Sequence, residues 1–367
     1  MPKIVSVELL HVDLPPPVPR SDAIQSFVTQ ETPFVRIACD DGSQGAGYTY
    51  TIGTGGSSVM ALLRDHLAPR LIGRDPALIE QIWRDLMFAT HATTVGAITS
   101  LALAAIDTAL WDLRCRRDRQ PLWRAAGGAK QRIPVYTTEG GWLQHPVETL
   151  VKETVAAKKA GFKGAKIKVG KPHVSDDVAR LKAVRNAVGD GFEIMVDANQ
   201  CFTLSEALRR APRYAELGIA WFEEPLPADD IAGHARLAAA SEVPIAVGES
   251  LYSPSQFAAY IQQGAASIVQ VDVARVGGIT PWLKVAHMAE AFNLAVCPHF
   301  LMELHVSLCA AVPSAAWVEY IPQLDAIATS RLAIEDGYAV APETPGLGID
   351  WRWDEIERRA RARHLVS

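Results

Sequence analysis

The chain has 367 residues, of which 49% are hydrophobic and 21% charged, and its formal net charge at pH 7 is −5. This composition is ordinary for a soluble globular protein, and the slightly acidic balance gives no electrostatic footprint for DNA or RNA. No apolar run is long enough to span a membrane, and the start of the chain shows no signal-peptide pattern, so we expect a cytoplasmic protein.

The first third of the sequence predicts strands followed by helices. Alternation from residue 4 to 13 predicts a strand, and a proline-rich loop then reaches about residue 32. Further strands are expected at 34–39 and 44–51, and helices at 58–71, 76–87 and 95–114. This order predicts an α+β domain, which we assign to residues 1–127. In the last helix we expect Asp107 to be buried and hydrogen-bonded and Asp112 to face solvent.

From about residue 133 the pattern changes to short β-branched runs alternating with longer amphipathic stretches. Strands are expected at 135–138, 164–169, 194–197, 219–223, 244–249, 268–272, 295–299 and 317–320. Eight strands joined by helices favour a parallel barrel of the (β/α)8 type, which we assign to residues 128–325. The remaining segment, 326–367, would pack back on the N-terminal domain.

Two lysines occupy the second of these strands. Side chains alternate along a strand, so Lys166 and Lys168 point to the same face. An amphipathic strand with one solvated face would explain the pair. Two buried ammonium groups would instead disfavour each other's charge, which is one way to make a lysine basic and neutral near pH 7.

Ionisable residues recur at the carboxyl ends of the predicted strands. They are Lys166 and Lys168, Asp197, Glu223, Glu249, Asp272, His299 and Glu319. Each is about one strand–helix unit from the next, and in a barrel these ends meet at one mouth. Any one acid could be a turn residue or a helix N-cap, but the whole set is hard to explain in that way.

The types of side chain in this set predict a chemistry. Asp197, Glu223 and Glu249 would repel one another without a cation, and three carboxylates suit Mg²⁺. Lys168 and His299 would flank the metal as two bases, with Asp272 orienting the imidazole. This arrangement fits abstraction of a proton α to a carboxylate, with an enediolate intermediate. Glu319 could hydrogen-bond the same carboxylate if a raised pKa kept it protonated.

The motifs that carry this set resemble those of the enolase superfamily, specifically its mandelate racemase subgroup. They are Lys166-Ile167-Lys168, Asp197-Ala198-Asn199-Gln200, Phe222-Glu223-Glu224-Pro225, Gly248-Glu249, the Asp272 and His299 pair, and Glu319. The resemblance implies a (β/α)7β modified TIM barrel with an N-terminal α+β capping domain. It also implies that Lys166 lowers the basicity of Lys168 and touches the substrate carboxylate, and that Asn199 and Thr138 contact the substrate.

The same resemblance implies that loops near 15–32 and 52–57 close over the mouth and select the substrate. Arg20 is the main cation in these loops that could bind a second substrate carboxylate. The resemblance implies a small carboxylate substrate, and members of this class often form homo-oligomers.

Segments 275–281, 298–305 and 345–348 look most like talarate/galactarate-type acid sugar dehydratases. We therefore expect Mg²⁺-dependent dehydration of an aldonate or aldarate to a 2-keto-3-deoxy acid. Two other functions stay open. A racemase or epimerase of a 2-hydroxy acid would use the same residues, and a non-catalytic sugar-acid binding protein would not need both bases.

Overall fold

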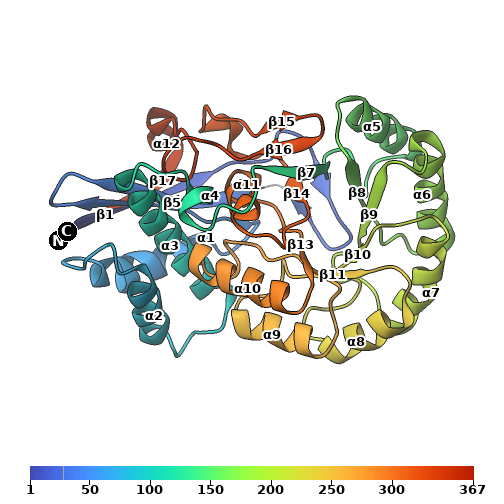
Figure 1. The fold of residues 1–367 in the computed structure, drawn as a ribbon, viewed down its shortest axis with the longest axis horizontal. Coiled ribbons are helices and arrows are strands. Elements are labelled where there is room, and N and C mark those ends of the chain that lie inside the picture. The colour runs from blue at the N-terminus through green and yellow to red at the C-terminus, as the bar shows by residue number, and fades with distance from the viewer. Residues whose placement is uncertain (28) are drawn as a thin grey trace.

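The computed structural model describes residues 1–27 and 29–367. Figure 1 shows a barrel beside a smaller N-terminal capping domain, with both chain termini on the capping side. The predicted fold class, a modified barrel with an α+β capping domain, is confirmed. In the part of the chain that is described, no helix is long and apolar enough to cross a membrane.

The capping domain is built on an antiparallel sheet in which the order is β17-β1-β4-β5, and β6 also pairs with β4. Strand β17 (Ala360–Val366) comes from the end of the chain. A separate two-stranded hairpin, β2–β3, follows β1. The strands are β1 (Ile4–Asp13), β2 (Arg20–Ser21), β3 (Ser26–Phe27), β4 (Gln30–Cys39), β5 (Gln44–Tyr48) and β6 (Thr51–Ile52). The helices are α1 (Gly56–Leu62), α2 (Ile79–Ala89), α3 (Ala97–Arg117) and α4 (Leu122–Ala125), and short π and 3₁₀ turns at Leu63–Leu67 and Ala68–Arg70 extend α1.

Helix α3 joins the capping domain to the barrel. Its Ala- and Leu-rich sequence is buried on nearly all sides, as expected for a helix enclosed by other elements. On one side it lies so close to β5 that a Cβ at Gly45 or Gly47 would overlap the carbonyl of Ala109 or Ala105. On the other side the Trp111 indole donates to the Thr280 hydroxyl of the barrel at 2.9 Å.

The barrel consists of eight parallel strands. They are β7 (Arg132–Thr137), β8 (Gly164–Lys168), β9 (Glu193–Asp197), β10 (Phe222–Glu223), β11 (Ile245–Val247), β12 (Ile268–Val269), β13 (Ala295–Val296) and β14 (Val318–Tyr320). Neighbours pair from β7 through to β13, β14 pairs with β7, and a parallel bridge from Val296 to Ala315 closes the ring. Each of the eight predicted strands therefore exists, although several are shorter than expected.

Seven helices of the described chain connect these strands, one after each of β7 to β13. They are α5 (Val147–Lys159), α6 (Val174–Val188), α7 (Leu204–Ala215), α8 (Ile231–Ala240), α9 (Pro254–Gln262), α10 (Ile279–Ala291) and α11 (Met302–Ala311). After β14 the chain instead forms a 3₁₀ turn, Leu324–Ala326, and then β15 (Ala333–Glu335), β16 (Tyr338–Val340), α12 (Trp353–Arg359) and β17 (Ala360–Val366). Strand β17 pairs with β1, so the end of the chain returns to the capping sheet.

Candidate active site

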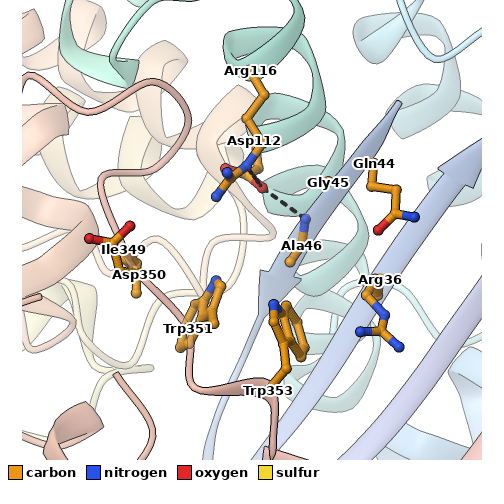
Figure 2. Close-up of a pocket in the computed structure, with 10 residues that line it drawn as sticks. All are labelled: Arg36, Gln44, Gly45, Ala46, Asp112, Arg116, Ile349, Asp350, Trp351 and Trp353. Atoms are coloured by element: carbon orange, nitrogen blue, oxygen red, sulfur yellow. Dashed lines mark hydrogen bonds and ion pairs between the residues drawn. The ribbon is translucent and has the colours of Figure 1, made fainter. Parts of the chain in front are cut away.

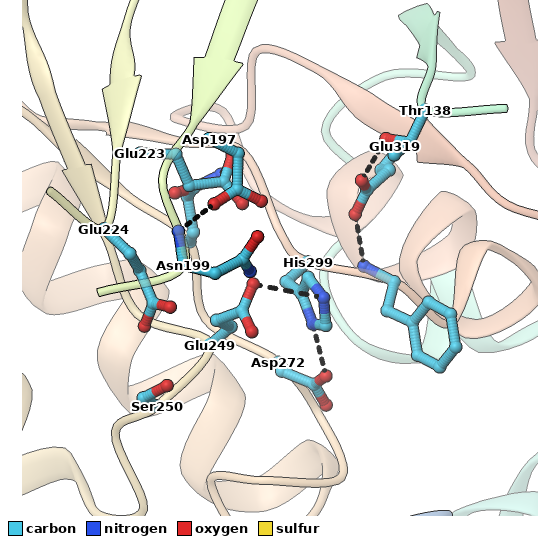
Figure 3. A network of polar contacts seen from close by, with 12 residues as sticks. Thr138, Asp197, Asn199, Glu223, Glu224, Glu249, Ser250, Asp272, His299 and Glu319 are labelled. Atoms are coloured by element: carbon cyan, nitrogen blue, oxygen red, sulfur yellow. Dashed lines mark hydrogen bonds and ion pairs between the residues drawn. The ribbon is translucent and has the colours of Figure 1, made fainter. Parts of the chain in front are cut away.

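The ionisable residues predicted at the strand ends lie together at one mouth of the barrel. Lys168, Asp197 and Glu223 are the last residues of β8, β9 and β10. Asp272 and His299 lie three residues beyond the ends of β12 and β13, and Glu249 and Glu319 come from just after β11 and from within β14. Because carboxyl ends of parallel strands share one rim, residues more than a hundred positions apart face one another (Figure 3).

Three carboxylates form the centre of this site. One oxygen from each of Asp197, Glu223 and Glu249 lies within 4.8 Å of the others. All three side chains are buried, and Glu249 Oε2 accepts no well-aligned hydrogen bond among the described residues, although His299 Nε2 lies 3.3 Å from it. An acceptor left unpaired inside a protein is unfavourable unless a cation or water satisfies it. The donor set therefore fits a hard divalent cation.

The carboxylates strongly perturb one another's acidity. Burial and the neighbouring Asp197 raise the pKa of Glu223 to about 7. Burial also opposes the charge of Asp197, but Lys168 and Lys166 outweigh it and hold that pKa at about 2. Buried carboxylates that lie this close together and are compensated by neighbouring cations are typical of a functional site.

Two side chains outside the predicted set orient Glu223. The Gln270 amide and the Trp221 indole both donate to Glu223 Oε2, at 2.7 and 3.1 Å. Gln270 follows β12, the strand that ends before Asp272, and Trp221 immediately precedes β10. Neither is ionisable, so a search for charged residues at strand ends could not find them.

The two lysines of β8 are buried and paired with carboxylates, which excludes the solvated-face interpretation. Lys166 Nζ lies 2.7 Å from both Glu223 and Glu319, and Lys168 Nζ lies 2.5 Å from Asp197 Oδ2. The Trp142 ring, another residue not predicted, lies 5.5 Å from Lys168 Nζ.

The pKa of Lys168 differs from our expectation. Burial lowers it, but Asp197 raises it more, so the pKa lies above its ordinary value, and Lys166 lowers it only in part. Lys166 therefore acts on Lys168 in the expected direction, but without a metal ion the contact with Asp197 outweighs it. An opposite charge in direct contact favours the ammonium more than a second ammonium disfavours it.

His299 and Asp272 form the expected pair. His299 Nδ1 lies 2.9 Å from Asp272 Oδ2, and Nε2 lies 3.3 Å from Glu249 Oε2. Burial opposes the imidazolium, but Glu249 and Asp272 outweigh it and raise the pKa of His299. Tyr50, which the sequence did not indicate, donates to the same Asp272 oxygen at 2.6 Å and accepts from Arg275 at 3.0 Å.

Glu319 is held as a carboxylate, which corrects our expectation of a protonated donor. It accepts hydrogen bonds from Lys166, the Thr138 hydroxyl and the Phe300 backbone N–H. Burial alone would raise its pKa, but Lys166 and these donors lower it to about 2. Thr138 is thus occupied by Glu319, and both are fully buried.

A small, partly open cavity lies beside these residues. The barrel lines it with Lys166, Lys168, Asn199, Glu249, Arg275, His299 and Glu319, together with Trp142, Phe300 and Ile321, and the capping domain adds Asp22, Gln25, Phe27 and Ile52. The expected loops therefore do reach the mouth. Arg20 is not in this lining, because its side chain is buried in an ion pair with Glu139.

A second hollow of about 340 Å³ lies in the capping domain, and none of the three carboxylates lines it. Figure 2 shows the residues that line it. It is bounded by β4, β5, α3 and the segment before α12, with Trp351 and Trp353 on one side. Asp112 borders it but is 1% exposed, and it accepts the N–H groups of Ala46 and Leu347 while pairing with Arg116. The expectation that Asp112 faces solvent is therefore wrong, whereas Asp107 is buried and hydrogen-bonded as expected.

Comparison with known proteins identifies two family domains in the chain. Residues 4–127 match the mandelate racemase/muconate lactonizing enzyme N-terminal domain, and residues 149–355 match the enolase C-terminal domain-like family. L-talarate/galactarate dehydratase of Salmonella typhimurium is 36% identical over 96% of this chain and 92% of its own length. Arabinonate dehydratase of Saccharolobus solfataricus is 34% identical over 86% of this chain and 87% of its own.

Solved structures agree with this assignment. The Salmonella typhimurium L-talarate/galactarate dehydratase liganded with Mg and L-lyxarohydroxamate superposes with a TM-score of 0.96 at 34% identity, over 100% of this chain and 95% of the other. L-talarate dehydratase from Polaromonas sp., complexed with Mg and L-glucarate, has a TM-score of 0.96 at 36% identity over all of both chains. The chain therefore belongs to the mandelate racemase/muconate lactonizing enzyme family of the enolase superfamily.

Proposed function

We propose that this protein is a Mg²⁺-dependent dehydratase that converts an acid sugar to a 2-keto-3-deoxy acid. One observation carries the proposal: two basic side chains contact different members of one carboxylate cluster. Lys168 lies against Asp197, and His299 lies against Glu249. Similarity to two named acid sugar dehydratases along almost the whole chain supports the same reaction.

Asp197, Glu223 and Glu249 would hold the metal ion. Their convergent oxygens fit such a ligand set, and Glu249 Oε2 accepts no hydrogen bond among the described residues. Bound there, Mg²⁺ would supply positive charge that favours deprotonation next to a carboxylate.

Lys166, Asn199 and Glu319 would position the substrate carboxylate. Lys166 and Asn199 both line the cavity, and the Lys166 ammonium and the Asn199 side-chain N–H groups are donors that a carboxylate can accept from. Glu319, as an ionised carboxylate, would accept a hydrogen bond from the Lys166 ammonium and so orient it. Thr138 would act by holding Glu319, since its hydroxyl already donates to that carboxylate.

The protein's side chains would then move two protons. A base removes the proton on C2, and the electron pair of that C–H bond passes toward the carboxylate. The electrons return to form a C2–C3 double bond as the C3–O bond breaks, and protonated His299 gives the departing hydroxyl its proton, releasing water. Lys168 is the base when the C2 proton and the C3 hydroxyl leave from opposite faces of the substrate. His299 is the base when both leave from the same face. The resulting enol tautomerises to the 2-keto-3-deoxy acid.

A racemase or epimerase is the second candidate, because bases on two sides of one cluster also suit inversion at C2. The two reactions differ in product. In D₂O, an epimerase would incorporate deuterium into an inverted acid, whereas a dehydratase would form a keto acid.

A library of acid sugars, assayed with the purified protein and Mg²⁺ for keto-acid formation, tests the proposal. We expect at least one member to yield a 2-keto-3-deoxy acid, and addition of EDTA to stop the reaction. Absence of keto acid across the library, or deuterium exchange with inversion alone, would contradict it.

A further inference from the structure

The capping-domain wall of the active-site cavity carries one charge among its described residues, and that charge is negative. This wall consists of Asp22, Gln25, Phe27 and Ile52. Asp22 follows β2 in the β2–β3 hairpin and is 7% exposed. A substrate bound by its carboxylate at the barrel side would direct its other end toward these residues.

The Asp22 carboxylate is fixed by the backbone of its own turn. Its Oδ1 accepts the N–H groups of Ile24 and Gln25, both at 2.8 Å, and its own N–H donates to the Gln25 carbonyl at 3.1 Å. Among the described residues, Oδ2 has no hydrogen bond and the carboxylate has no ion pair. Burial raises the pKa of Asp22, and Lys168 across the cavity lowers it.

The hairpin that carries Asp22 is attached to the barrel loop after β7. Leu143 N–H donates to the Ser21 carbonyl at 3.0 Å, and the Gln144 side chain bonds both Ser21 N–H, at 3.1 Å, and the Pro19 carbonyl, at 2.7 Å. The rings of Phe27 and Trp142 pack edge to face, 5.5 Å apart. These contacts hold Asp22 at the cavity wall before any substrate binds, which favours specific recognition.

The cationic groups that line the cavity all lie on the barrel side and are paired there. Lys166 pairs with Glu223 and Glu319, Lys168 with Asp197, and His299 with Asp272. Arg275 donates to the Glu249 carbonyl at 3.0 Å and lies 3.7 Å from its carboxylate. With Arg20 buried against Glu139, a second carboxylate at the capping wall would meet Asp22 and no unpaired cation of the described chain.

We propose that Asp22 selects the substrate tail: its free oxygen accepts a hydrogen bond from a tail hydroxyl and repels a second carboxylate. The substrate is therefore an acid sugar with one carboxylate, an aldonate, and not an aldarate. This inference rests on the proposed function, because it takes the substrate carboxylate to bind at the barrel side. The relatives named above include dehydratases of both substrate kinds, so similarity alone does not make the choice.

The test compares aldonates with aldarates of the same configuration, such as galactonate with galactarate and gluconate with glucarate. We expect the wild-type protein with Mg²⁺ to use its best aldonate with a kcat/KM at least 100-fold above the matched aldarate. Asp22→Asn retains an oxygen for the turn N–H groups but loses the charge. It should lower the aldonate kcat/KM about tenfold, raise the aldarate value at least tenfold, and leave the melting temperature unchanged.

Asp75→Asn is the matched control. Asp75 is 9% exposed and its Oδ1 accepts Ala77 N–H in a similar turn, but it does not line the cavity. This variant should keep the wild-type preference. An aldarate preference, equal use of both acids, or an unchanged preference in Asp22→Asn would overturn the inference and leave the dehydratase proposal standing.

Calorimetric binding of the same acids separates the two proposals further. Selective binding of aldonates without turnover would contradict the dehydratase but support Asp22 selection. Turnover and tight binding of aldarates would support the dehydratase and contradict selection by Asp22.

Discussion

Single carboxylate oxygens determine how the site residues are oriented. Asp272 uses Oδ1 to accept the N–H groups of Ala274 and Arg275, and Oδ2 to accept from Tyr50 and to contact His299. Each oxygen therefore has its own donors, and the imidazole is held in one orientation. A buried carboxylate in this position also favours the charged form of the His299 imidazole.

Asp272→Asn should lower kcat by about 10²- to 10⁴-fold, because an amide nitrogen facing His299 cannot accept from Nδ1–H. Steady-state kinetics with the best substrate from the library measures the effect. Tyr50→Phe removes only one donor to the same oxygen and should lower kcat by roughly tenfold or less. Wild-type kinetics in Asp272→Asn would remove this residue from the mechanism.

Glu249→Gln should weaken Mg²⁺ binding by at least about tenfold, because a neutral amide replaces a charged oxygen ligand. Isothermal calorimetry of the metal alone measures this without any substrate. Glu8→Gln, in the capping sheet, is the control and should bind Mg²⁺ as the wild type does. Equal affinities in the two variants would contradict the role of Glu249 as a ligand.

The sequence predicted the ionisable residues at the strand ends, with Asn199 and Thr138, but not Asp22, Arg275 or the aromatic side chains beside them. Strand ends bring Lys168, Asp197 and His299 together by topology, so counting strand–helix units was enough to place them. Tyr50 and Trp142 reach the site from a capping strand end and from a loop, and no periodicity indicates where such side chains point. The charge state of Glu319 depends on three donors that only the folded chain brings together.

At the scale of elements, the parallel strands were predictable because their β-branched runs are short and fully buried. The sequence predicted helix α3 but not which other elements pack around it. Asp112 lies on a helix with several charged neighbours near its end, which suggested solvent. In the structure the backbone of β5 and residue Leu347 from the C-terminal segment cover it.

Asp107 in α3 should make the stability of the fold depend on pH. Burial raises its pKa from 3.8 to about 7, so its protonated form is favoured in the folded state. Its contribution to stability is fully present below pH 3.8 and is lost as the pH rises through about 7. The loss is about 1.4 kcal/mol per pH unit in that range.

Urea unfolding of the wild type and Asp107→Asn at pH 5 and pH 8 measures this dependence. Relative to the variant, the free energy of unfolding of the wild type should fall by about 3 kcal/mol between the two pH values. A difference that does not change with pH would show that Asp107 is ionised in the folded protein throughout this range.

For the whole molecule, we propose that residues 1–127, 128–325 and 326–367 are the capping domain, the catalytic barrel and a segment that returns to the capping sheet. Figure 1 shows the two parts side by side, with the end of the chain beside its beginning. The sequence indicated this division through its change of pattern near residue 133. The pairing of β17 with β1 joins residues 348 to 359 positions apart, which local patterns do not specify.

In this arrangement, residues from both the barrel and the capping domain line the site. The barrel supplies the carboxylates and bases, and the hairpin of the capping domain closes one wall of the cavity. Substrate choice can therefore change in the capping domain while the chemistry of the barrel stays the same. Assembly into a homo-oligomer stays a prediction.

The proposed role of His299 as the acid that releases water is tested by measuring keto-acid formation and deuterium incorporation at C2 together, for His299→Asn and the wild type in D₂O. We predict that the wild type forms a 2-keto-3-deoxy acid. His299→Asn should lose this product by at least about 10³-fold, and for a substrate whose C2 proton faces Lys168 it should still exchange that proton. Keto-acid formation at the wild-type rate in His299→Asn would show that His299 does not protonate the departing hydroxyl.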